Sequence, residues 1–197
     1  MVTEVVIEHE PELPHTPFSR RVDAILARIG EALSWIWLIL LGIIVTNVVL
    51  RYLLGEGRIE FEELQWHLYA IGFLLGLSYC YQNDEHVRVD VLHERISPRS
   101  RAWIELYGIV LLLLPFIALI LIYSLPFVVY SFETREVSSS PGGLPFRWLI
   151  KSMLPLGFLL LGLAALSRLT RVWKFLFLMP PPASPDSDIT RASLKCR

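Results

Sequence analysis

The sequence has few of the residues from which redox and metal sites are built. Its 197 residues include only two cysteines, Cys80 and Cys196, which lie far apart and form no CxxC pair or other metal-ligand spacing. The formal net charge is −1 and no strongly basic block occurs, which argues against a nucleic acid as partner. We therefore expect no catalytic residue, no metal site, no cofactor and no nucleic-acid partner.

The first thirty residues lack the pattern of a cleaved secretory signal. Such a signal has a basic start followed at once by an apolar core. This segment is instead polar, with four glutamates and three prolines before Arg20. We expect the first apolar run to stay in the protein as a membrane anchor.

Long runs free of Asp, Glu, Lys and Arg are the main positive feature. The chain is 54% hydrophobic with a mean hydropathy of +0.51, and the apolar residues are concentrated in runs at 32–50, 64–83, 106–132 and 152–167. About 20 apolar residues span a bilayer core of roughly 30 Å as a helix. Helices also satisfy their own backbone hydrogen bonds in lipid. The sequence therefore predicts an all-α integral membrane protein with four transmembrane helices.

These runs also predict the organisation of the chain. We expect a cytoplasmic N-terminal segment at 1–31 and a four-helix membrane domain at 32–174. Its spans are expected at about 32–54, 64–83, 103–132 and 148–168. The remaining residues, 175–197, are rich in proline and serine, which predicts a disordered cytoplasmic tail.

Basic residues predict the orientation of the spans. Ten Lys and Arg residues flank the spans on the side of the two termini, and five flank them on the other side. Because cytoplasmic flanks carry the excess of Lys and Arg, both termini are expected on the cytoplasmic side of the membrane.

Polar residues gather at the first expected hairpin. Since its two helices run antiparallel, we expect Arg51 opposite Glu63 and Asn47 opposite His67, in one interhelical polar cluster. Glu62 lies beside it, where the helix dipole favours anions. Three roles stay open: pinning the hairpin, contacting a partner subunit, or binding a substrate or ion. The last is disfavoured, because the middle of the first three spans has no acid or base.

The second expected span carries two further features. Gly72 and Gly76 form a GxxxG step, which predicts close approach of another helix. His67 has no second membrane histidine at matching depth, as a bis-histidine haem would need. We expect it to make an interhelical hydrogen bond instead.

The connections on either side of the third span hold the other candidates. Ser97 and Pro98 are typical of an N-cap and a first helical residue, so the third helix is expected to begin there. The preceding connection is either an amphipathic segment at the membrane surface or a solvated loop. After the third span, Glu136, Ser138 and the turn starting at Pro141 form a loop that either docks a soluble partner or serves as a spacer.

Five stretches together resemble a known family. They are NVVLRYLLG, EFEEL, GLSYCYQNDEHVRVDVL, SSSPGGLPFRW and LPLGF, and they cover roughly residues 30–170. In order and spacing the chain resembles the small membrane subunit (DctQ-type) of tripartite ATP-independent periplasmic (TRAP) transporters. The positions that match the family pattern are Arg51, Glu62, Glu63, His86, Asp90, Pro141, Leu144 and Pro145.

The resemblance implies a role and two partners. A large membrane subunit (DctM-type) would hold the substrate and sodium sites, and a periplasmic substrate-binding protein (DctP-type) would deliver the substrate, commonly a carboxylate. The small subunit would scaffold the large one in the lipid bilayer, and the loop with Glu136 and Leu144 would face the binding protein. The PGGLP form is similar to a branch that includes keto-acid transporters.

The sequence disfavours two other functions. A membrane anchor or cytochrome-like subunit of an oxidoreductase is disfavoured by the missing histidine and cysteine pairs. An exporter that acts alone is disfavoured because no internal repeat is visible and no mid-span carboxylate offers a proton site.

Overall fold

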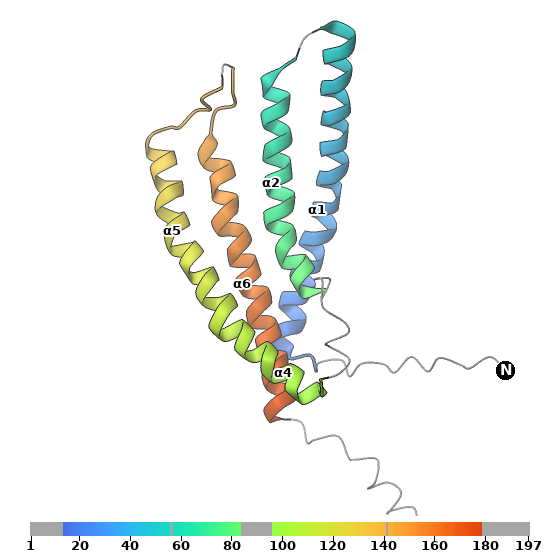
Figure 1. Ribbon diagram of the computed structural model, residues 1–197, viewed down its shortest axis with the longest axis vertical. Coiled ribbons are helices and arrows are strands. Elements are labelled where there is room, and N and C mark those ends of the chain that lie inside the picture. The colour runs from blue at the N-terminus through green and yellow to red at the C-terminus, as the bar shows by residue number, and fades with distance from the viewer. Residues whose placement is uncertain (1–13, 56, 84–95, 141, 179–197) are drawn as a thin grey trace, which may run out of the picture.

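The computed structural model describes residues 14–55, 57–83, 96–140 and 142–178, and these ranges contain helices and no strand. The elements are α1 (Pro17–Val49), the π-helical segment η1 (Leu50–Leu54), α2 (Ile59–Gln82), α4 (Pro98–Tyr107), the π-helical segment η2 (Gly108–Leu113), α5 (Leu114–Glu133) and α6 (Arg147–Phe177). Figure 1 shows α1 beside α2 and α5 beside α6, with α4, η2 and α5 forming one long rod.

The two ends of the bundle differ in what they contain. α1 begins and α6 ends at the same end, which we call the terminal end (Figure 1). The opposite end, which we call the loop end, carries the turn with Gly55 and the connection between α5 and α6. Residues 134–140 and 142–146 of this connection are described, and we call them the connection 134–146.

Three helices are long and apolar enough to cross a membrane: Pro17–Leu53, Pro98–Glu133 and Arg147–Phe177. The prediction of an all-helical membrane protein is therefore confirmed for the described residues. The 24-residue helix α2 runs antiparallel to α1 but is less apolar, since it contains Gln65, His67 and Gln82. A fourth crossing and cytoplasmic termini remain predictions.

Helix boundaries follow from local capping. Thr16 is the N-cap of α1, its hydroxyl accepts from the Ser19 backbone N–H, and Pro17 occupies the first turn. This capping box begins the helix well before the span expected at residue 32. Gly55, at φ 70°, follows η1 in the left-handed conformation that favours glycine. The prediction that Ser97 caps the third helix, with Pro98 in its first turn, is confirmed.

The apolar core lies toward the terminal end. α6 packs against α1, α2, α4 and α5, and three clusters of buried residues all draw on it. One joins Ala102 of α4 to Val172, a second joins Ile117 of α5 to Ala165, and a third joins Leu26 of α1 to α6. In α1 no buried residue follows Leu40.

Glycines set the closest helix approaches. A Cβ at Gly157 of α6 would lie 2.7 Å from the backbone oxygen of Leu74, so α6 and α2 meet there backbone to backbone. At Gly72 a Cβ would lie 3.2 Å from the Trp37 ring of α1, whereas at Gly76 it would meet nothing within 4 Å. Of the predicted GxxxG step, only Gly72 packs closely within the described chain.

Candidate functional site

A carboxylate at the start of α2 fastens the connection 134–146 at the loop end. Ser138 Oγ donates a hydrogen bond to Glu63 Oε1, and the Leu144 backbone N–H donates to Glu63 Oε2 over 2.6 Å. A Cβ at Gly143 would lie 2.9 Å from Glu63 Oε1, so any side chain at this position would clash with the carboxylate. We call Glu63, Ser138 and Leu144 the Glu63 clasp.

A second carboxylate fastens the same connection to α6. Lys151 Nζ donates to Glu136 Oε2, and Arg147 Nη1 lies 3.8 Å from Glu136 Oε1. The Lys151 side chain is only 16% exposed, and its Nζ lies 4.1 Å from the centroid of the Phe127 ring in α5. Ion pairing and cation–π attraction together hold this lysine at the junction of α5, α6 and the connection.

Backbone hydrogen bonds pair the two arms of the connection. The Ser138 N–H donates to Leu144 O and the Arg147 N–H donates to Glu136 O, each over 3.4 Å. The turn between the arms includes Gly142 at φ 79°. Phe146 has φ 66°, in a left-handed region that is costly for an aromatic residue. The connection is thus a folded loop whose shape is imposed by its fastenings.

Both fastening carboxylates are ionised at neutral pH. The hydrogen bonds from Ser138 and from the Leu144 N–H lower the pKa of Glu63, which precedes the span expected at 64–83. The hydrogen bond from Lys151 lowers the pKa of Glu136 in the connection. Both therefore accept as carboxylates.

The predicted pairing of the first hairpin is replaced by these contacts. Among the described residues, Glu63 bonds to Ser138 and Leu144, and no ion pair joins it to Arg51, which is exposed. His67 Nδ1 lies 2.5 Å from the backbone oxygen of Glu63, so its hydrogen bond stays within α2 and the prediction of an interhelical bond is wrong. Antiparallel packing places two residues at the same depth, but it does not determine which side of each helix faces the other. Depth alone therefore did not predict the partners of Glu63.

The other predicted residues are placed as follows. Asn47 is half-buried, while Glu62 and Pro145 are exposed. Of the residues expected in the outer loop, the structure brings Ser138 and Leu144 together on Glu63, and ties Glu136 to α6. His86, Asp90 and Pro141 lie outside the described residues.

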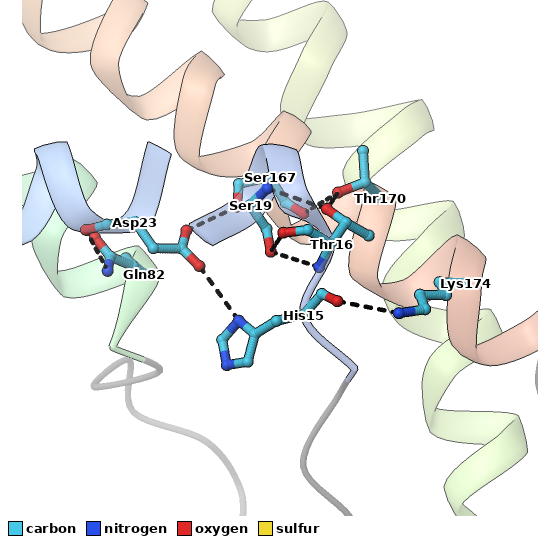
Figure 2. A network of polar contacts seen from close by, with 8 residues as sticks. All are labelled: His15, Thr16, Ser19, Asp23, Gln82, Ser167, Thr170 and Lys174. Atoms are coloured by element: carbon cyan, nitrogen blue, oxygen red, sulfur yellow. Dashed lines mark hydrogen bonds and ion pairs between the residues drawn. The ribbon is translucent and has the colours of Figure 1, made fainter. Parts of the chain in front are cut away.

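Sequence reasoning missed a polar network at the terminal end, drawn in Figure 2. Asp23 Oδ1 of α1 accepts from Ser167 Oγ of α6 over 2.7 Å, and Gln82 Nε2 of α2 donates to the Asp23 backbone oxygen over 3.0 Å. His15 Nδ1 lies 3.8 Å from Asp23 Oδ2. The Asp23 side chain is 15% exposed. We call Asp23, Gln82 and Ser167 the Asp23 junction, since they tie α1, α2 and α6 together.

Further contacts surround this junction. The Thr16 and Thr170 hydroxyls lie 3.1 Å apart, and Lys174 Nζ donates to the His15 backbone oxygen over 3.1 Å (Figure 2). Nearby, Arg168 of α6 donates to Glu105 of α4. The sequence signal was the cap Thr16 with a proline after it, followed by apolar residues at helical spacing.

A family model described as "Tripartite ATP-independent periplasmic transporters, DctQ component" matches residues 40–175. No curated protein matches the sequence. The matched range includes all three residues of the Glu63 clasp and ends within α6, whereas Asp23 and the cap of α1 precede it.

Proposed function

Because the chain belongs to the DctQ family of TRAP transporter components, we propose that it is the small, non-catalytic subunit of such a transporter in a bacterial inner membrane. The complete transporter would take up an organic acid, driven by sodium. A large DctM-type membrane subunit would carry the substrate and ion sites. A periplasmic DctP-type binding protein would deliver the substrate.

The exposed surface of the helices supports a scaffolding role. Within the apolar windows of the three candidate spans, only 11%, 17% and 22% of residues are buried. Large side chains such as Trp35, Leu112 and Tyr123 are exposed. Such surfaces need lipid or the helices of another subunit around them. Broadening a larger membrane subunit would use this surface directly.

The arrangement of α2 supports a fourth crossing. α2 returns from the loop end to the terminal end beside α1 and packs against both α1 and α6. Packing on two sides shelters its less apolar residues from lipid. With four crossings, both termini would lie on one side of the membrane, and the excess of Lys and Arg in the flanks on that side predicts that it is the cytoplasmic side.

The loop end would then face the periplasm. In that orientation the folded connection 134–146, with Glu136, Ser138, Leu144 and Pro145, meets the side from which a binding protein arrives. The family membership carries this proposal, because it alone supplies the partners.

Affinity purification of the tagged chain from its native membranes tests the proposal. We expect co-purification of a larger membrane protein, and solute uptake by proteoliposomes only when that protein and a binding protein are both present. A matched preparation without the larger protein is the control. Sodium-driven uptake by the chain alone would refute the proposal.

A further inference from the structure

The connection 134–146 is fastened more firmly than a spacer between two helices requires. The Glu63 clasp ties it to α2, the Glu136–Lys151 pair ties it to α6, and backbone bonds pair its arms. None of these fastenings buries a large apolar side chain from the loop. Val137 and Phe146 stay 57% and 66% exposed.

The exposed part of the connection has the composition of a protein contact. Val137 and Phe146 supply apolar area. Val137 lies two residues after the exposed Arg135, and Phe146 directly precedes Arg147, whose side chain is 40% exposed. An apolar centre with a charged rim is typical of protein interfaces, where aromatic residues carry much of the binding energy. A loop already held in its bound shape also loses less conformational entropy on binding.

We propose that Glu63 is a positioning residue, which holds the connection 134–146 in the shape that receives the soluble substrate-binding protein through Val137 and Phe146. This inference rests on the proposed function and adds to it a defined surface and the residue that shapes it. Glu63 acts through Ser138 and Leu144, so it touches neither the binding protein nor the substrate.

Charge-neutral variants of two neighbouring glutamates form the central experiment. Glu63→Gln replaces the carboxylate by a neutral amide, so the hydrogen bonds that Ser138 and the Leu144 N–H make to it lose their charge-assisted strength. Glu62→Gln makes the same chemical change at an exposed residue next to it and is the matched control. Ser138→Ala removes the hydroxyl donor and keeps the Leu144 bond, so it is the intermediate case.

The readout is uptake by the complete transporter in proteoliposomes, with loaded binding protein titrated. We expect the apparent KM for the binding protein to rise about tenfold in Glu63→Gln and about threefold in Ser138→Ala, with kcat unchanged. Glu62→Gln is expected to match the unaltered protein, and Phe146→Ala to raise KM. An unchanged KM in Glu63→Gln, or a fall in kcat alone, would overturn the proposal.

Assembly is measured first, which separates this inference from the proposed function. If the unaltered chain forms no complex with a large subunit, the proposed function fails. If the complex forms and transports but the KM values do not follow the order of the variants, only the positioning role fails. Should Glu63→Gln not assemble, Ser138→Ala and Phe146→Ala decide the matter.

Labelling distinguishes a protein partner from a lipid surface. In a chain with Cys80 and Cys196 replaced by serine, Phe146→Cys is treated with a membrane-impermeant maleimide. We expect rapid labelling that the loaded binding protein slows. A residue that stays unlabelled in vesicles without binding protein lies in lipid, and that outcome contradicts the proposed contact.

Discussion

The terminal end and the loop end hold the same helices together by different means. At the terminal end, apolar clusters and the Asp23 junction join helix directly to helix. At the loop end, α1 has no buried residue beyond Leu40, and the Glu63 clasp joins α2 to the α5–α6 connection. Fastening through the loop leaves Val137 and Phe146 of that loop exposed. The comparison teaches that the helices pack directly on one another at one end and are held through a connection at the other.

The largest effect is expected where two helix backbones meet. Gly157→Ala would place a Cβ 2.7 Å from the Leu74 backbone oxygen, so α2 and α6 must move apart. We expect a loss of about 1–3 kcal/mol, the usual range for overpacking. Gly76→Ala is the control, since a Cβ there meets nothing within 4 Å. Thermal unfolding in detergent measures both, and equal melting temperatures would contradict the close approach.

The Asp23 junction is expected to contribute less than the helix contact. Asp23→Ala leaves Ser167 Oγ without its acceptor in a part-buried place, which costs about 1–2 kcal/mol. Glu31→Ala, an exposed acid on the same helix, is the control. In a double-mutant cycle with Ser167→Ala the losses are expected to be less than additive. Full additivity would show that the hydrogen bond contributes nothing.

The loop end is expected to respond to acid through its two carboxylates. Hydrogen bonds lower the pKa values of Glu63 and Glu136 below the usual 4.5. Their contribution is therefore complete above that value and is lost as the pH falls through the lowered values. Amide exchange at Leu144, corrected for its intrinsic rate, is expected to stay slow from neutral pH down to 4.5 and to quicken only as the pH falls below 4.5. Fast exchange at neutral pH would contradict the clasp.

The smallest effect is expected at Arg51. It is exposed and forms no ion pair with Glu63 in the described chain, so Arg51→Ala is expected to change the stability of the isolated chain by less than about 0.5 kcal/mol. Combined with Glu63→Ala, the two losses are expected to add. A non-additive pair in detergent-solubilised chain would restore the pairing expected from the sequence.

Local and compositional features of the fold could be predicted from the sequence. The Ser97 cap depends on neighbouring residues alone, and the long apolar helices depend on composition, so both were accessible. The start of α1 could not be predicted in this way. Pro17 begins an amphipathic stretch, in which Val22 and Leu26 are buried, and such a stretch is not a wholly apolar run.

The candidate site could be predicted only in part. Glu63 and Ser138 were each identified, but their contact joins residues 75 positions apart. Asp23 and Ser167 are 144 positions apart. Such contacts depend on how each helix is rotated about its axis, and polar residues at matched depth do not determine that rotation.

The π-helical segment Gly108–Leu113 affects how the chain tolerates changes in length. A π turn contains one residue more than an α turn, and here the Leu114 N–H reaches back to Ile109 O. Deleting one residue inside it would leave a regular α-helix, with α4 and α5 still facing α6. The same deletion elsewhere in Pro98–Glu133 would rotate one half by about 100° relative to the other. The π-helical turn is therefore the place where this helix can lose one residue while α4 and α5 keep their contacts with α6.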